Sequence, residues 1–259
     1  MIAKNPASYR GHTNLGIALS NAERHEASIR EHRKALQIRP DLADARNNLG
    51  EAFRRKGRLD EAIEHFRQAL LIDAEFGEAH YNLGLSLRSL GRMHEAAASF
   101  SEALRVTGHW PDARYHLART VAAQGHLDKA VAQFRQTLLE NPDHVAALNE
   151  PAWLFATNQE RPGRDATELQ QAVTLAERAA RLTGRRNPWI LDTLAAAYAA
   201  TRRFDDAVQA AGLASEIAMG SGQETLAKQV RERLDRYQRA MPVESGRSTP
   251  QQRKPDRQN

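Results

Sequence analysis

Cysteine is missing from all 259 residues of the chain. Its absence excludes disulfide bonds, thiolate nucleophiles and cysteine-ligated zinc or iron–sulfur clusters. Long apolar stretches are missing too, because no run approaches the roughly 18 residues that a membrane-spanning helix needs. The start of the chain, Met1–Pro6, lacks the apolar core of a secretory signal. We therefore expect a chain that neither inserts into a membrane nor crosses one, and that stays in the cytoplasm.

The chain also lacks the short motifs that carry catalysis or metal binding. Its ten histidines lack the His-Glu-x-x-His spacing of a zinc site. There is no glycine-rich phosphate loop and no Gly-x-Ser-x-Gly nucleophile elbow. We expect no cofactor, no bound metal and no catalytic residue, and hence a protein that is not itself an enzyme.

The charge balance is only mildly basic. The 37 lysines and arginines exceed the 32 acidic residues by five, and the isoelectric point is about 9.7. This excess admits an acidic partner but does not require nucleic acid. RNA binding by a helical-repeat array would rest on the isoelectric point alone, so we do not expect a nucleic-acid partner.

What the chain does have is an internal repeat of 34 residues. Four leucines lie at this spacing, each followed by a small residue: Leu15-Gly16, Leu49-Gly50, Leu83-Gly84 and Leu117-Ala118. Other classes of residue recur at the same period, namely Gly57, Gly91 and Gly125, then Phe66, Phe100 and Phe134, and the prolines Pro6, Pro40 and Pro142. Agreement between so many classes at one period predicts a repeat protein.

Within a unit, apolar and small residues recur three and four positions apart, stop at a glycine turn and resume. This pattern predicts two amphipathic helices, and so each unit is expected to be a helical hairpin. A single hairpin cannot bury its apolar face alone, whereas stacked hairpins share one core. The predicted fold is all-α, a right-handed superhelical solenoid of stacked antiparallel helix pairs, with a concave groove lined by the first helices.

The order of these residues, Leu-Gly followed by Gly, Ala, Phe, Ala-Leu and Pro, resembles the tetratricopeptide repeat (TPR) family as found in bacteria. The resemblance implies repeats over residues 9–42, 43–76, 77–110 and 111–144, and weaker ones over 145–187 and 188–220. It also implies a scaffold for protein–protein interaction.

Repeat five departs from this pattern twice. Its alanine pair arrives eight residues late, which predicts an enlarged turn over residues 158–167. Pro151 stands inside the expected first helix, so either Asn149 caps a shortened helix or the helix kinks at the proline.

The two ends of the chain fall outside the repeats. Leu226, Val230, Leu234 and Tyr237 share one face of residues 221–240, which predicts a C-terminal capping helix. Residues 241–259 have the composition of a disordered tail. Residues 1–8 read as the end of a truncated preceding repeat, and the apolar edge left uncapped there is open to self-association.

The groove positions are expected to have no packing role and so to be free for binding. One column of the repeat runs Asn14, Asn48, Asn82, His116 and Glu150. An asparagine amide pairs with both the carbonyl and the N–H of an extended peptide. A similar ladder in O-linked N-acetylglucosamine transferases implies recognition of a flexible partner's backbone. The alternative is that asparagine stands there because it is solvated and close to a helix start.

Neighbouring columns add aromatic and basic residues in repeats two to four: Asn47, Tyr81 and Tyr115, then Arg54, Arg55, Arg88 and Arg119. Arginine binds carboxylates through two hydrogen bonds, which favours an extended and acidic peptide. Carboxylates lie in nearby positions at Asp44, Glu51, Glu78 and Asp112. The alternative is therefore a solvated face whose charges cancel.

Two tryptophans, Trp153 and Trp189, fall at groove-facing registers of repeats five and six. Exposed tryptophans often anchor a partner. They equally suit the core, where they would fill the gap left by Pro151 and the enlarged turn.

Two functions follow from these observations. The first is a non-catalytic scaffold that binds an extended, acidic peptide in its groove. The second is an auxiliary domain of a larger enzyme, such as a protein O-glycosyltransferase, in which the same groove recruits the substrate.

Overall fold

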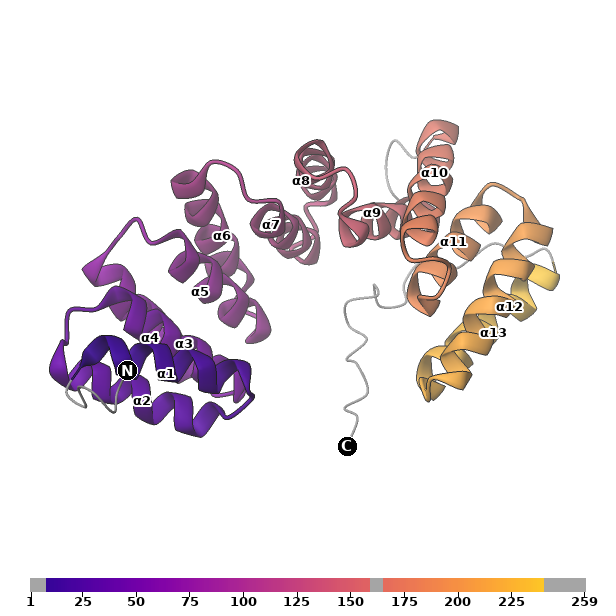
Figure 1. Cartoon of the computed structure of the whole chain (residues 1–259). Helices are drawn as coiled ribbons and strands as arrows, with labels where there is room; N and C mark the ends of the chain where they lie inside the picture. Colours follow the sequence, from indigo (N-terminus) through magenta and orange to yellow (C-terminus); the bar gives the residue numbers. More distant parts are fainter. Residues whose placement is uncertain (1–7, 159–164, 240–259) are drawn as a thin grey trace. The chain divides into compact units, whose positions relative to one another are not determined.

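A computed structural model describes residues 8–158 and 165–239 of the chain. These residues form thirteen α-helices and, within the described ranges, no strand. The chain divides into two compact units, residues 1–136 and 137–259 (Figure 1). The center of the enlarged turn predicted in repeat five, the tail from residue 241 and nearly all of the truncated repeat at residues 1–8 lie outside the described residues.

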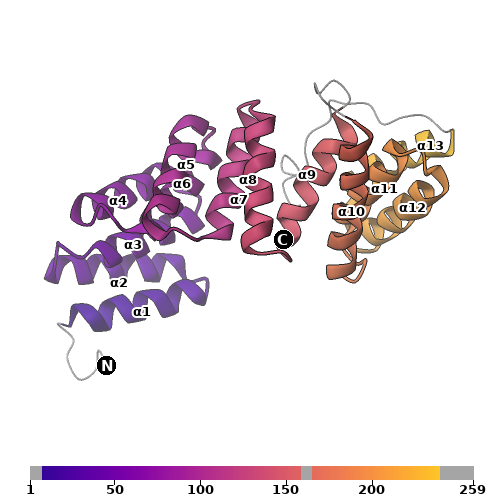
Figure 2. The ribbon, with the colours of Figure 1, turned by 90° about the horizontal axis from the view of Figure 1, so that it is seen from above.

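Unit 1 is a stack of helical hairpins. Its helices are α1 (Tyr9–Asn21), α2 (His25–Ile38), α3 (Ala43–Arg55), α4 (Leu59–Ile72), α5 (Gly77–Ser89), α6 (Met93–Thr107), α7 (Pro111–Ala123) and α8 (Leu127–Glu140), of which α8 continues past the unit boundary. Each helix from α1 to α6 packs against the next one along the chain, so that one hairpin follows another (Figure 2). The predicted fold class, an all-α stack of antiparallel helix pairs, is confirmed.

Glycine ends the first helix of the hairpins where the period predicted a turn. Gly57 and Gly91 both have φ of +76°, a left-handed conformation that costs glycine little because it has no side chain. Glu23 stands at the same register in the first repeat and adopts φ of +58° despite its side chain. The turn is therefore imposed by the packing of the two helices, and glycine is the residue that fits it with least strain.

Small residues let the two helices of a hairpin approach closely. The ring of Phe66 covers Gly50, and the ring of Phe100 covers Gly84. Both phenylalanines are completely buried, as are Ala62 and Ala96 on the facing helices. The packing explains why glycine and phenylalanine recur together, since each ring occupies the space that a side chain on the glycine would fill.

Replacing Gly84 by alanine is expected to lower the free energy of unfolding by about 1–3 kcal/mol, the usual cost of an overpacked core. The new Cβ would lie 2.7 Å from Cε1 of Phe100, so the ring has to move. Gly212 in the second unit is the matched control, because it is helical and has no atom within 4 Å of a new Cβ. There the same substitution should be neutral or stabilising, since alanine favours a helix. Urea denaturation followed by circular dichroism measures both, and equal effects at the two glycines would contradict the packing argument.

Unit 2 contains α9 (Val145–Thr157), α10 (Ala166–Leu182), α11 (Pro188–Ala200), α12 (Phe204–Gly220) and α13 (Glu224–Gln238). Helix α9 runs through Pro151 without ending there, and its N-cap is His144, whose side chain accepts a hydrogen bond from the N–H of Ala147. The interpretation in which Asn149 caps a shortened helix is therefore wrong. Pro151 is buried, so its ring takes part in the packing of the unit.

Helix α13 is tied to the rest of unit 2 by a buried ion pair. Arg233 of α13 donates two hydrogen bonds to the carboxylate of Asp192 on α11, at 2.8 and 2.5 Å. The two residues are 5% and 0% exposed. The guanidinium also lies 5.5 Å from the ring centroid of Trp153 on α9. One arginine thus links three helices.

Apolar side chains complete the attachment of α13. Leu226, Val230 and Tyr237 are buried on its inner face. Burial, followed by the nearby negative charge of Asp192, raises the pKa of Tyr237 far above its ordinary value. Across the described residues, no helix is both long and apolar enough to cross a membrane.

Candidate functional site

The first helices of unit 1 lie side by side. Helix α3 contacts both α1 and α5, and α5 contacts α7. Because the helices are related by the 34-residue period, side chains at one register form a row across them. We call the surface that carries the predicted binding residues on α1, α3, α5 and α7 the first-helix face. All eleven of these residues lie in unit 1.

The asparagine column is divided between surface and interior. Asn14 is exposed and Asn48 half-buried, and among the described residues neither side chain has a hydrogen-bond partner. Asn82 is only 7% exposed and donates from Nδ2 to Oδ1 of Asn47 at 3.1 Å. Asn47 is 1% exposed and in turn donates to Glu78 at 3.2 Å. The expectation that these positions have no packing role is therefore wrong for Asn47 and Asn82, which join α3 to α5.

Arg54 and Arg55 of α3 are paired within their own helix. Arg54 donates to both carboxylate oxygens of Glu51, at 2.6 and 2.8 Å, and Arg55 donates to the same carboxylate at 2.8 Å. These hydrogen bonds to Glu51 raise the pKa of Arg54. The carboxylate of Glu51 thus accepts hydrogen bonds from two guanidinium groups, and the three side chains together carry a single net positive charge.

Aromatic rings form the centre of the first-helix face. Tyr81 of α5 stacks on Trp110 with ring centroids 4.6 Å apart, and its ring is 5.6 Å from that of His116 on α7. Burial, and next the carboxylate of Asp112, raises the pKa of Tyr81, while Arg54 and Arg88 oppose the rise. The tyrosine therefore lies among aromatic rings and is influenced by charges of both signs.

Tyr115 and Arg119 continue this cluster on α7. Tyr115 is 8% exposed, packs beside His116 and Phe134, and lies 5.5 Å from the guanidinium carbon of Arg119. Arg88, His116 and Arg119 are half-buried. Tyr115 therefore serves mainly to support the cluster, and Nδ1 of His116 and Nε of Arg119 are buried beside it.

Trp110 was not among the residues that the sequence singled out. It is the N-cap of α7, in the connection between two hairpins and outside the helical columns. The 34-residue period could have found it, because Leu42 and Phe76 occupy the same N-cap position in the two preceding repeats. A large apolar side chain at this register is thus a regular feature of the repeats, and Trp110 is its largest example.

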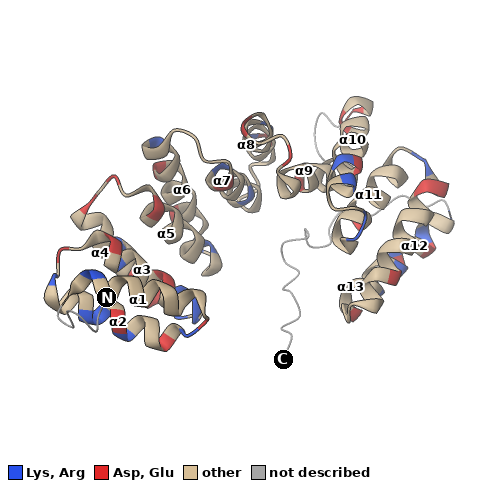
Figure 3. Cartoon of the chain, viewed as in Figure 1, with Lys and Arg blue, Asp and Glu red and all other residues tan. Residues whose placement is uncertain are grey.

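The first-helix face carries both signs of charge. Its four arginines, Arg54, Arg55, Arg88 and Arg119, are matched by four carboxylates, Asp44, Glu51, Glu78 and Asp112. Figure 3 likewise shows blue and red mixed along the helices of unit 1. The face is therefore distinguished by its rings and amides, and an acidic partner gains no advantage from net charge alone.

The two tryptophans of unit 2 differ in their surroundings. Trp153 is 4% exposed and lies beneath Arg233, so it belongs to the core. Trp189 is half-buried near the start of α11. The interpretation of Trp153 as an exposed anchor is wrong, whereas Trp189 remains open to both interpretations.

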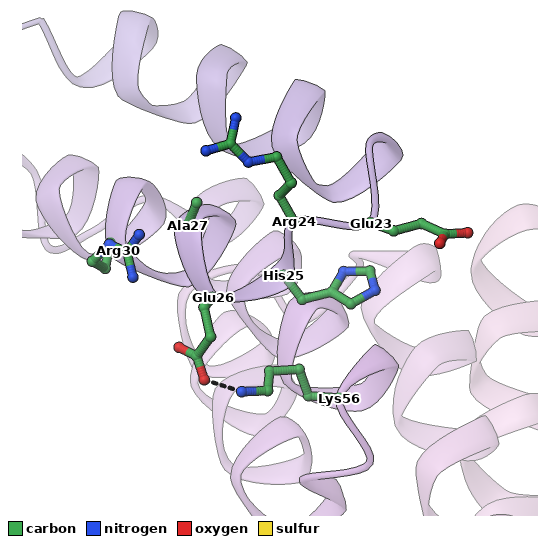
Figure 4. Close-up of a pocket in the computed structure, with 7 residues that line it drawn as sticks. All are labelled: Glu23, Arg24, His25, Glu26, Ala27, Arg30 and Lys56. Atoms are coloured by element: carbon green, nitrogen blue, oxygen red, sulfur yellow. Dashed lines mark hydrogen bonds and ion pairs between the residues drawn. The ribbon is translucent and has the colours of Figure 1, made fainter. Parts of the chain in front are cut away.

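A shallow pocket of about 370 Å³ lies at the turn between α1 and α2, away from the predicted residues. Figure 4 shows His25 and Lys56 facing it, with Glu26 and Lys56 joined as an ion pair. Its lining mixes both signs, since Arg24 and Arg30 stand beside Glu23 and Glu26. Among the described residues no group of three metal-ligating side chains occurs, here or elsewhere. The first-helix face is the better candidate because it extends over four helices.

Comparison with known proteins identifies the repeats. The tetratricopeptide repeat matches residues 8–75 in one family profile and 87–149 in a second, together just over half of the chain. No curated protein matches the chain.

Several solved structures are similar in fold. The pilF protein of Pseudomonas aeruginosa is 20% identical, with a TM-score of 0.72 over 87% of this chain and 97% of that one. YrrB, described as a TPR protein with an unusual peptide-binding site, is 24% identical, with a TM-score of 0.57 over 71% and 95%. MamA is 20% identical, with a TM-score of 0.58 over 66% and 95%.

Proposed function

Because the chain belongs to the tetratricopeptide repeat family, we propose that its first-helix face binds an extended segment of a partner protein. Repeats of this family make a protein-interaction scaffold. The observation that carries the finer proposal is the arrangement around α3 and α5. There the amide of Asn48 and the ring of Tyr81 lie on neighbouring helices of one continuous face.

The chemistry of this face suits a peptide backbone with an apolar side chain beside it. Asn48 offers an acceptor and two donors that no described residue uses. The stacked Tyr81 and Trp110 offer a flat apolar surface. Arg54 and Arg55 add donors whose charge Glu51 only partly cancels. YrrB, with a similar fold, is described as having a peptide-binding site, which supports the same use of the repeats here.

Asn82 and Asn47 have a different role in this proposal. Their hydrogen bond and the contact with Glu78 hold α3 and α5 at a fixed spacing. They position the groups that touch the peptide. Substituting them would disturb the framework and binding together, so they are unsuitable as tests of contact.

The double variant Asn48→Ala, Arg55→Ala is expected to weaken peptide binding about tenfold or more, because each lost hydrogen bond contributes about 0.5–1.5 kcal/mol, or more where a charge takes part. Peptides would be selected from a random phage-displayed library on the wild-type chain, and their affinities for the variants measured by fluorescence anisotropy. The matched control is Arg67→Ala on second helix α4, where the side chain is exposed and pairs with Glu95. Equal affinity for wild type and the double variant would refute binding at this face.

A further inference from the structure

Helix α1 exposes a stripe of apolar residues that is buried in the later repeats. Leu15 is 39% exposed, whereas Leu49 and Leu83 at the same register are 1% and 8% exposed. Ala18 is exposed, whereas Ala52 at its register is completely buried. Figure 2 shows α1 at the outer edge of unit 1. This edge is the stripe of Leu15, Ala18 and Leu19, spaced as one face of the helix. Ala22, the C-cap of α1, extends it at a register where the next two repeats have the exposed Lys56 and Leu90.

The other repeats show what kind of surface covers this stripe. Helix α2 packs on α3, and α4 packs on α5, so the equivalent residues are covered by another amphipathic helix with small and apolar side chains. The stripe on α1 is therefore suited to being covered by a helix. What remains to be identified is the source of that helix.

Two features point to a second copy of the same helix. First, α1 carries one charged residue, Arg10, apart from His12, which is buried and paired with Glu31. Two such faces can meet without like charges opposing each other. By contrast, α13 carries Lys228, Arg231 and Asp235 as exposed side chains, which makes it a poor partner for an apolar stripe.

Second, the stripe is complementary to itself. If two copies of α1 meet in antiparallel orientation about a two-fold axis between residues 18 and 19, Leu15 lies opposite Ala22 and Leu19 lies opposite Ala18. Each large side chain then faces a small one, which lets the helices approach closely. Leucine against leucine would hold them apart.

We propose that the chain forms a two-fold symmetric dimer through the α1 stripe. A stripe of two helical turns buries less than the roughly 1,200 Å² of a stable interface. The dimer is therefore expected to be weak. This proposal does not depend on peptide binding at the first-helix face, since the two surfaces carry different residues.

The test is sedimentation velocity of the whole chain over a concentration series. Wild type should pass from monomer to dimer, and Ala18→Glu should raise the dissociation constant at least tenfold, because two carboxylates would be forced together. The control is Leu71→Glu, which changes a leucine that is 86% exposed on α4, and it should leave the dimer unchanged. Peptide binding by Ala18→Glu should equal that of wild type.

The absence of cysteine allows a second measurement of the same contact. Ala18→Cys should form a disulfide-linked dimer on mild oxidation, whereas Ala98→Cys, at an exposed alanine of α6, should not. A wild-type chain that is monomeric throughout would overturn the proposal. So would dimerisation that Ala18→Glu and Leu71→Glu weaken equally. A dimer that forms only after residues 1–7 are deleted would also overturn it, because those residues would then be the natural cover of the stripe.

Discussion

Replacing Arg233 by methionine should lower the free energy of unfolding by about 3–5 kcal/mol, because it leaves the carboxylate of Asp192 buried without its positive partner. Asp192 is completely buried, and Arg233 holds both of its oxygens. The loss should appear in urea denaturation followed by tryptophan fluorescence, to which Trp153, lying against the arginine, contributes together with Trp110 and Trp189. The loss of stability is large because the carboxylate of Asp192 stays buried away from water but no longer interacts with the positive charge of Arg233.

A second substitution separates the cost of an unpaired charge from the value of the pair. Asp192→Leu together with Arg233→Met removes both charges and should recover most of the stability, since apolar replacements of a buried ion pair are often neutral or stabilising. Arg203→Met is the matched control, because that arginine is also ion-paired and stacked on a tyrosine but is exposed. Its loss should be small, as for most surface pairs. If Arg233→Met and Arg203→Met cost the same, the buried pair does not stabilise unit 2.

The repeated positions explain why the fold could be predicted. Leu49, Phe66 and Ala62 are buried because each repeat contributes the same contacts, so one period determines many positions at once. A contact that occurs only once in the chain does not recur at the 34-residue period, so the period does not predict it. Asp192 and Arg233 lie 41 residues apart on helices that the period does not relate, and neither residue type suggests a buried partner.

The candidate site was predictable in part for a similar reason. The helical register predicts that Asn48, Tyr81 and Arg55 share one face, and the two helices that carry them, α3 and α5, are in contact. Register could not tell how closely α3 approaches α5, and that distance decides whether Asn47 and Asn82 face solvent or each other. Helix-face periodicity does not point to Trp110, because this residue stands between two helices.

Repeat one has a histidine where the next three repeats have phenylalanine. His32 is completely buried, and a Cβ on Gly16 would lie 2.6 Å from its ring, just as Phe66 lies over Gly50. Neither ring nitrogen has a hydrogen-bond partner. Burial lowers the pKa of His32 from 6.5 to about 4, and the negative charge of Glu31 opposes this only in part.

This lowered pKa makes the stability of unit 1 depend on pH. The unfolded chain takes up a proton near pH 6.5, whereas the folded chain resists it until about pH 4. The contribution of His32 is therefore fully present above pH 6.5 and is lost as the pH falls towards 4, by about 3 kcal/mol at 1.36 kcal/mol for each pKa unit. Urea denaturation between pH 4 and pH 7.5 measures this loss.

His32→Phe should remove that loss and also raise the free energy of unfolding at neutral pH, because two unpaired nitrogens leave the core and the ring of the other repeats takes their place. His109→Phe, at an exposed histidine, is the control and should keep the wild-type dependence on pH. A His32→Phe curve parallel to that of wild type from pH 7.5 to pH 4 would show that the buried imidazole is not the group responsible. A flatter curve would establish that the buried imidazole of His32 contributes to the acid sensitivity of unit 1.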